Sequence, residues 1–170
     1  MREAVITCQD SAVLHYFVQN LPLIGCYLNY RKSNKFCYRI NGIKESGRKN
    51  MTNYFLNTIR DLCLTKEKHI PHIYKCNTRE ARLRLLAGFI DADGHYDGYD
   101  FEITQCKKHE GLFDEILWLA NSLGFGAYKH AKPSTYKGKI FPAFRMHVSG
   151  NIEVIPTLCP RKKAVVRKKS

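Results

Sequence analysis

Two carboxylates separated by one residue, Asp91 and Asp93, end the apolar stretch Leu86–Ile90. If this stretch is helical, both carboxylates lie at the carbonyl end of the helix, which carries roughly half a negative charge. Acidic side chains are mildly destabilising there unless a cation compensates them, and a divalent metal is the first candidate. The residue types therefore point to metal chemistry at the end of a helix.

The helix that would carry these carboxylates is expected to begin near Thr78, with Asn77 as its N-cap and Glu80 as the capping-box partner. Small residues recur on one face, which Gly88 and Ala92 make nearly flat. A glycine inside a helix costs roughly 0.5–1 kcal/mol relative to alanine. The usual reason for accepting this cost is the close approach of another backbone, so we expect a second helix to pack against Gly88.

Two other interpretations of the aspartates are open. An ordinary core helix could end in a solvated turn. A calcium loop would place Asp91, Asp93 and Glu102 at loop positions one, three and twelve. That loop also requires an acid or amide at position five and glycine at six, where this chain has His95 and Tyr96, so the calcium loop is disfavoured.

The composition favours a nucleic-acid partner. The 170 residues carry a net charge of +13, far more than solubility requires, so we expect a polyanion, with nucleic acid ahead of a membrane surface. Ribosomal or chromatin-type binding would give the same charge. With no apolar run near ~20 residues and no secretory apolar region, the chain is expected to be soluble and intracellular. Seven cysteines without CxxC pairs indicate reduced thiols.

The chain also repeats an order of segments, which predicts two copies of a strand–helix–strand–strand–helix unit. Each copy has an Ile-Thr segment, an apolar-periodic segment, a Gly-X-Tyr sequence and a basic strand-like segment. The matching positions are Ile6 and Ile103, Ser11–Leu23 and Leu112–Leu123, Gly25 and Gly126, and Asn29–Ile40 and Lys129–Val148. The predicted boundaries are residues 1–64 for the first half, 65–76 for a linker, 77–160 for the second half and 161–170 for a basic tail.

Within the predicted linker, His69, His72 and Cys76 have a spacing that could bind zinc. No clear fourth ligand accompanies them, so a polar connector is the favoured interpretation.

The basic strand-like segments could form a DNA-binding surface. Alternation in Phe144–Val148 places Arg145 and His147 on one face, and an antiparallel ribbon of this kind can enter the major groove. The tail Arg161–Lys169 is expected to bind phosphates, to be disordered or to serve as a nuclear-import signal. The candidate DNA contacts are Tyr27, Asn29, Arg31, Lys32, Arg39, Lys129, His130, Lys132, Lys137, Arg145 and His147.

The nine residues Leu86–Gly94 resemble the LAGLIDADG motif of homing endonucleases, with Phe89 in place of a leucine. From about Ile6 to Lys163 the chain is similar to the intein-encoded endonucleases of the yeast vacuolar ATPase type and to the mating-type switching endonucleases. The resemblance implies an α+β fold. Two pseudo-symmetric αββαββα-type halves would form a saddle of antiparallel sheet on DNA.

The resemblance also implies an activity: magnesium-dependent hydrolysis, with Mn²⁺ as a substitute, of both strands of a long DNA site. Asp93 matches the metal-binding carboxylate, with the Ala92 carbonyl beside it, whereas Asp91 helps to end the helix and lies close to the metal. The assisting lysines match Lys139 in the second half and Lys35 in the first. Gln105, and less clearly Gln9, are candidates for residues beside the metal ligands.

The first half begins almost directly at Ile6, so its motif helix is missing from these residues. The preceding sequence could supply that helix, a second copy of the chain could supply it, or the chain could be a DNA-binding protein that does not cleave. The first explanation is favoured. The chain lacks the terminal residues of a splicing domain, so we expect it not to splice alone. As an endonuclease of this type, it is expected in the nucleus or with a host protein.

Overall fold

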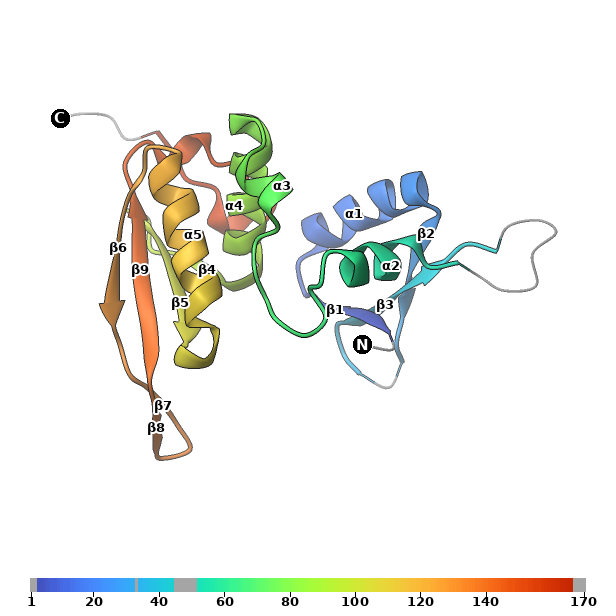
Figure 1. The fold of residues 1–170 in the computed structure, drawn as a ribbon, viewed down its shortest axis with the longest axis horizontal. Coiled ribbons are helices and arrows are strands. Elements are labelled where there is room, and N and C mark those ends of the chain that lie inside the picture. The colour runs from blue at the N-terminus through green and yellow to red at the C-terminus, as the bar shows by residue number, and fades with distance from the viewer. Residues whose placement is uncertain (1–2, 33, 45–51, 167–170) are drawn as a thin grey trace. The chain divides into compact units, whose positions relative to one another are not determined.

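The computed structural model describes residues 3–32, 34–44 and 52–166. The chain forms two compact units, Met1–Glu67 and Lys68–Ser170, which we call the first and second unit (Figure 1). Their boundary lies inside the predicted linker, because residues from Lys68 onward belong to the second unit and Ile70 is buried in its core. In the described part of the chain, no helix is long and apolar enough to cross a membrane.

The first unit is a three-stranded antiparallel sheet with two helices. Its elements are β1 (Ala4–Thr7), α1 (Ser11–Asn20), β2 (Cys26–Tyr30), β3 (Cys37–Gly42) and α2 (Tyr54–Asp61), with a 3-10 turn at Leu21–Ile24. The strand order is β1-β3-β2. Its small core brings together Ala4, Cys26 and Ile40 of the sheet with Leu56 of α2.

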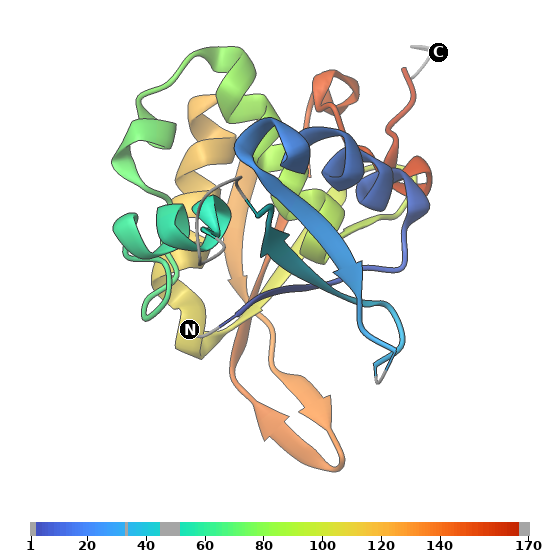
Figure 2. The same cartoon turned by 90° about the vertical axis from the view of Figure 1, so that its right-hand side faces the viewer.

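The second unit packs its two longest helices on one four-stranded antiparallel sheet, and a small hairpin projects from the end of that sheet (Figure 1, Figure 2). The sheet order is β4-β5-β9-β6, and the hairpin is β7-β8. Its elements are α3 (His72–Lys75), α4 (Arg79–Asp93), β4 (Gly94–Tyr96), β5 (Phe101–Cys106), α5 (Glu110–Ser122), β6 (Gly126–Ala131), β7 (Ser134–Tyr136), β8 (Lys139–Phe141) and β9 (Ala143–Ser149). The 3-10 turns are Lys107–His109, Ile152–Val154 and Pro160–Lys162.

The predicted repeat is present as a shared topology. The first unit orders its strands β1-β3-β2 and the second orders the corresponding strands β5-β9-β6, so the last strand lies in the middle of each. The second unit adds α4 and β4 in front and the hairpin between β6 and β9. The prediction of a helix at the end of the second copy is wrong. Two 3-10 turns take its place, because Pro156 and Pro160 lack the N–H that a continuous helix needs.

The alternation predicted in Phe144–Val148 is confirmed by the strand register. Met146 pairs with Ile103 and Val148 with Phe101, and all four side chains are fully buried beneath α4 and α5. Residues of the other parity therefore lie on the opposite side of the sheet, which we call the polar face. It carries His95, Glu102, Thr104, Tyr128, His130, Arg145 and His147.

The start of α4 corrects one prediction. Thr78 is the N-cap, because its hydroxyl accepts a hydrogen bond from the backbone N–H of Ala81 at 3.3 Å. Asn77, the predicted cap, instead accepts from the N–H of Thr78. At the other end the chain turns directly into β4. A Cβ on Gly94 would lie 2.8 Å from backbone atoms of Ile90, so this tight turn requires glycine.

Candidate functional site

Asp93 is the last residue of α4, and its side chain is exposed. The pairing of Gly94 with Ile103 brings the end of α4 beside β5. There the Gln105 amide Nε2 donates a hydrogen bond to Asp93 Oδ2 at 3.0 Å. The structure thus brings two of the predicted site residues into contact, and Gln105 helps to fix the direction of the Asp93 carboxylate.

Asp91 has a different environment, although it lies only two residues away. Its carboxylate accepts the backbone N–H groups of Leu158 at 2.8 Å and Cys159 at 3.0 Å. Each of its two carboxylate oxygens accepts one of these hydrogen bonds. Asp91 therefore anchors the C-terminal segment of the second unit to the end of α4.

The cation expected at the end of α4 is present in the protein itself. Lys162 is 4% exposed, and its Nζ donates to the backbone carbonyls of Ile90 at 2.7 Å and Asp91 at 2.8 Å. An ammonium group at this position compensates the negative end of the helix. The prediction that the whole tail from Arg161 binds phosphates is therefore wrong for Lys162, which is a buried part of the fold.

The two predicted assisting lysines are both exposed. Lys139 is exposed on β8 of the projecting hairpin. Lys35 is exposed in the β2–β3 loop of the first unit, with Nζ 4.9 Å from the centre of the Phe36 ring. Within the described residues of the second unit, Lys139 forms no hydrogen bond or ion pair with Asp93.

The end of α4 offers few donor atoms for a metal ion. No group of three His, Cys, Asp or Glu side chains able to hold a metal occurs in residues 3–32, 34–44 and 52–166. The three residues whose spacing could bind zinc form no such group, although Cys76 Sγ lies 3.4 Å from His72 Nε2. Mg²⁺ is usually held by one or two carboxylates with water and phosphate oxygens. Exposed Asp93, with Ala92 beside it, fits as the protein's share of such a site.

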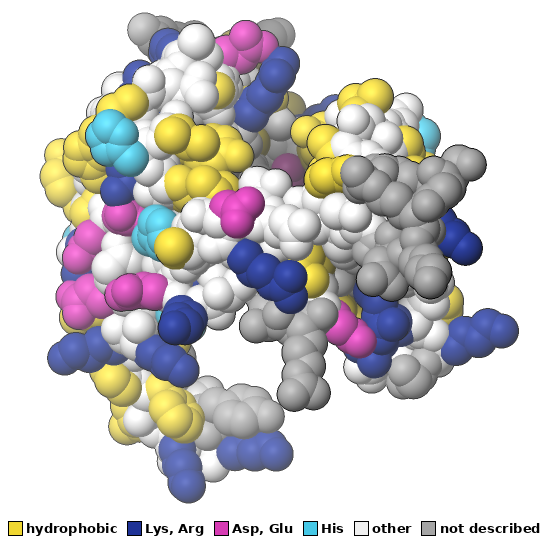
Figure 3. All heavy atoms as spheres, turned by 45° about the vertical axis from the view of Figure 1, so that its right-hand side comes forward, with side chains coloured by type: hydrophobic (Ala, Val, Ile, Leu, Met, Phe, Trp, Pro, Cys, Tyr) yellow, Lys and Arg dark blue, Asp and Glu magenta, His cyan; other side chains and the backbone are white. Residues whose placement is uncertain are grey.

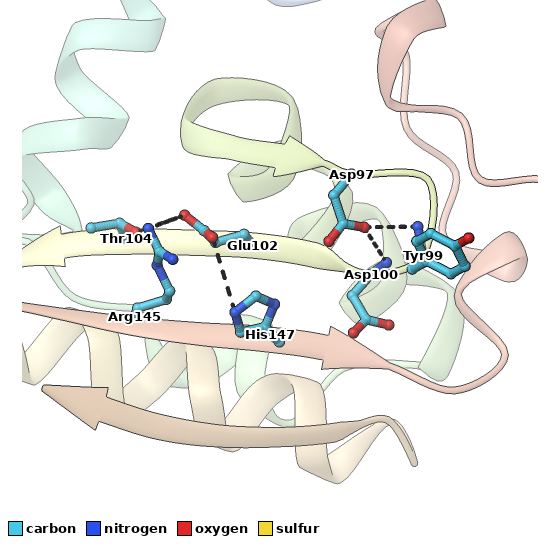
Figure 4. Close-up of polar contacts among 7 residues, drawn as sticks. All are labelled: Asp97, Tyr99, Asp100, Glu102, Thr104, Arg145 and His147. Atoms are coloured by element: carbon cyan, nitrogen blue, oxygen red, sulfur yellow. Dashed lines mark hydrogen bonds and ion pairs between the residues drawn. The ribbon is translucent and has the colours of Figure 1, made fainter. Parts of the chain in front are cut away.

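The polar face contains a charged cluster around Glu102 (Figure 4). Glu102 Oε1 accepts from Arg145 Nη2 at 2.8 Å and from the Thr104 hydroxyl at 3.4 Å. His147 Nε2 lies 4.0 Å from the other carboxylate oxygen. The predicted contacts Arg145 and His147 thus share this face with an acid that the sequence reasoning missed. The alternation of apolar and polar residues in β5 could have placed Glu102 on this face.

The turn between β4 and β5 is held by Asp97, at the edge of the same face (Figure 4). Its carboxylate accepts the backbone N–H groups of Asp100 at 2.8 Å and Tyr99 at 2.7 Å. These bonds lower the pKa of the Asp97 carboxyl below its ordinary value, with the Asp100 amide contributing most. The Asp97 carboxylate therefore stays charged to a lower pH than an ordinary aspartate.

Lys129 lies on the opposite side of the sheet from Arg145, which corrects its prediction as a DNA contact. It pairs in register with buried Met146, and its Nζ donates to Asp114 at 2.7 Å and Glu110 at 2.6 Å on α5. These carboxylates, Asp114 first, raise the pKa of Lys129. Its ammonium also lies 4.2 Å from the centre of the Phe144 ring. Lys129 therefore ties α5 to the sheet.

The remaining candidates in the second unit surround the polar face and the hairpin. His130 pairs with Arg145 on the polar face, and Lys132 is exposed where the chain enters the hairpin. Lys137 occupies the hairpin turn with a φ of 49°. The space-filling view shows lysine side chains around this projecting hairpin, at the lower left (Figure 3). These residues form one basic end of the second unit.

In the first unit, the candidates gather on the sheet face opposite the core. Asn29 pairs directly with Arg39, and Tyr27 shares their face. Arg39 and Arg31 lie 2.9 Å and 3.8 Å from the Glu3 carboxylate, whereas Lys32 is exposed in the following loop. This sheet therefore also has a polar side, which the sequence pattern showed less clearly.

Comparison with known proteins supports the fold. No family model and no curated protein sequence matches the chain. Mesophilic variants of the homing endonuclease I-DmoI align with a TM-score of 0.55 at 15% identity, covering 86% of this chain and 73% of theirs. The structure of I-DmoI in complex with DNA and Ca aligns with a TM-score of 0.52 at 12% identity, covering 86% and 68%. The predicted homing-endonuclease-like α+β fold is confirmed.

Proposed function

We propose that this chain is the DNA-binding and catalytic part of a site-specific, intein-type endonuclease that hydrolyses double-stranded DNA. The observation that carries the proposal is the exposed Asp93 carboxylate, oriented by Gln105 at the end of α4. The fold is that of a homing endonuclease that has been crystallised with DNA and Ca. The same proposal places the protein inside the cell, in the nucleus or with a host protein.

A second helix is needed to complete the proposed site. Around Gly88, a Cβ would meet no atom within 4 Å among the described residues, and both Gly88 and Ala92 are exposed. A helix from the preceding sequence, or from a second copy of the chain, could pack closely on this small-residue face. It would also bring the second carboxylate that two-strand cleavage requires.

The residues have distinct tasks in the proposed reaction. Asp93 and the Ala92 carbonyl would hold Mg²⁺, or Mn²⁺ in its place, together with a DNA phosphate. The bound ion would lower the pKa of a water molecule and offset charge on the scissile phosphate. Gln105 would keep Asp93 in one orientation. The polar side chains of the two sheets and the basic hairpin would hold the DNA in register.

The test has a binding stage and a cleavage stage. Duplexes that bind the chain are first recovered from a random pool. These sites are then incubated with a longer form of the chain that includes the residues encoded upstream. We expect Mg²⁺-dependent cuts in both strands and none with EDTA. Selection of a defined site without any cut would instead support a non-cleaving DNA-binding protein. Failure to select any site would overturn both functions.

The Gly88→Ala variant tests the helix partner. Alanine at an exposed helix position should stabilise the chain alone by about 0.5–1 kcal/mol, because glycine pays a larger backbone entropy cost. With the preceding sequence present, the added methyl group should obstruct helix packing and reduce cleavage. Urea unfolding and cleavage rates are the measurements. A variant that is more stable yet cuts at the wild-type rate would contradict close packing at Gly88.

The variants Lys132→Met and Lys129→Met test the DNA-facing surface. Each phosphate contact contributes about −0.9 to the slope of log affinity against log salt. Lys132 is exposed and should lose about this amount, whereas Lys129 is tied to Asp114 and Glu110 and should leave the slope unchanged. Fluorescence anisotropy between about 50 and 200 mM salt measures the slope. Equal slopes for the two variants would contradict the assignment.

A further inference from the structure

Glu102 is an acid in the middle of a surface otherwise suited to DNA. It pairs across the sheet with His147, and Thr104 in the next row pairs with Arg145. In a chain of net charge +13, this carboxylate takes Arg145 into an ion pair and so removes positive charge from a phosphate-binding surface. A surface that only held the DNA backbone would gain nothing from it. Glu102 is therefore better suited to contact a base edge, where hydrogen-bond donors are also present.

The Glu102–Arg145 pair presents a donor beside an acceptor. Arg145 Nη2 donates to Glu102 Oε1 at 2.8 Å, and Arg145 Nε is buried with no partner among the described residues. Its accessible N–H groups are therefore those of the two terminal nitrogens. The side chains of Glu102 and Arg145 are 22% and 25% exposed, so both reach the surface while the sheet restrains them.

A G·C base pair has the complementary pattern in the major groove. Guanine offers the acceptors N7 and O6, and cytosine offers its N4 amino group as a donor beside them. Arg145 could donate to guanine while Glu102 accepts from cytosine. If both terminal nitrogens of Arg145 donate, to N7 and O6, the two donors and the Glu102 acceptor need the order acceptor, acceptor, donor. An A·T pair places its donor between its two acceptors, so it leaves one of these three groups unmatched.

The ion pair brings the two head groups within reach of one base pair. Glu102 and Arg145 belong to neighbouring rows of the sheet, but Arg145 Nη2 and Glu102 Oε1 lie only 2.8 Å apart, less than the roughly 3.4 Å between stacked base pairs. The ion pair also orders Arg145 before binding, and the Thr104 hydroxyl adds a second bond to Glu102. Such preorganisation lowers the entropy cost of recognition.

We propose that Glu102 and Arg145 together read one G·C base pair of the DNA site, with Glu102 as a specificity-determining residue. This inference rests on the proposed DNA-binding function but not on cleavage.

The test compares sites selected from random duplexes by the full wild-type chain and by Glu102→Gln. The wild type should show one position where G·C is preferred by about tenfold or more. Glu102→Gln should lose most of that preference, keep the preferences at other positions and bind random DNA at least as tightly. Glu80→Gln is the matched control, because it removes an acid from an exposed ion pair with Arg84 on α4.

Arg145→Lys provides a second variant that retains the charge but not the two-pronged donor geometry. It should weaken the preference at the same base pair. If Glu102→Gln and Arg145→Lys both select the wild-type site with unchanged preferences, the inference is overturned while DNA binding stands. If the wild type itself selects no site, the proposed function fails first. Circular dichroism confirms that each variant is folded.

Discussion

Asp93→Asn is expected to reduce metal-dependent DNA cleavage by at least about a hundredfold without weakening the fold. The substitution removes the charge that would hold the metal ion. The side chain is exposed, and an asparagine oxygen can still accept the hydrogen bond from Gln105. Stability should therefore change by less than about 0.5 kcal/mol.

The neighbouring Asp91 supplies a matched comparison for this prediction. Asp91→Asn replaces a carboxylate that accepts two backbone N–H groups with an amide that has one acceptor oxygen. It should destabilise the second unit by about 1–3 kcal/mol, because one buried donor loses its partner. Two aspartates in one short motif should thus give opposite results, with Asp93 required for cleavage and Asp91 required for stability.

The measurements are cleavage of a selected site with Mg²⁺, binding of the same site with EDTA, and urea unfolding. Asp93→Asn should bind with wild-type affinity in EDTA, which separates lost chemistry from lost DNA contact. An Asp93→Asn variant that cuts at the wild-type rate would remove Asp93 from the site. A large loss of stability would contradict the exposed position of the Asp93 side chain.

Local patterns predicted much of this fold because the interactions behind them are local. The apolar spacing and first-turn polar residues predicted α4, which begins within one residue of the expected start at Thr78. Alternation in Phe144–Val148 predicted the buried face of β9. The order of repeated segments predicted two copies of one strand–helix–strand–strand unit, and the two sheets share the order of their corresponding strands.

Contacts between distant segments could not be predicted in this way. Lys162 reaches a helix end that lies 72 residues earlier in the chain, and nothing in its basic neighbourhood distinguishes it from the exposed Lys163. The orientation of Lys129 depends on the strand register, since its pairing with Met146 shows that it faces α5. The role of Glu102 likewise depends on which strands become neighbours.

Lys162→Met is expected to destabilise the second unit by about 2–5 kcal/mol. Methionine can fill the same space, but it leaves the carbonyls of Ile90 and Asp91 without the ammonium donor. Ile90 is fully buried, so water cannot readily replace the lost bond. The negative end of α4 also loses its compensating charge. The loss should therefore exceed that of an ordinary surface substitution.

Urea unfolding of the full chain can measure this effect in the correct unit, because the single tryptophan, Trp118, lies on α5. Lys163→Met is the matched control: it removes the same charge from an exposed neighbour and should change stability by less than about 0.5 kcal/mol. Equal stabilities for the two variants would contradict the assignment of Lys162. A selective loss would mean that the end of α4, and with it the position of Asp93, depends on a buried lysine from the last segment of the second unit.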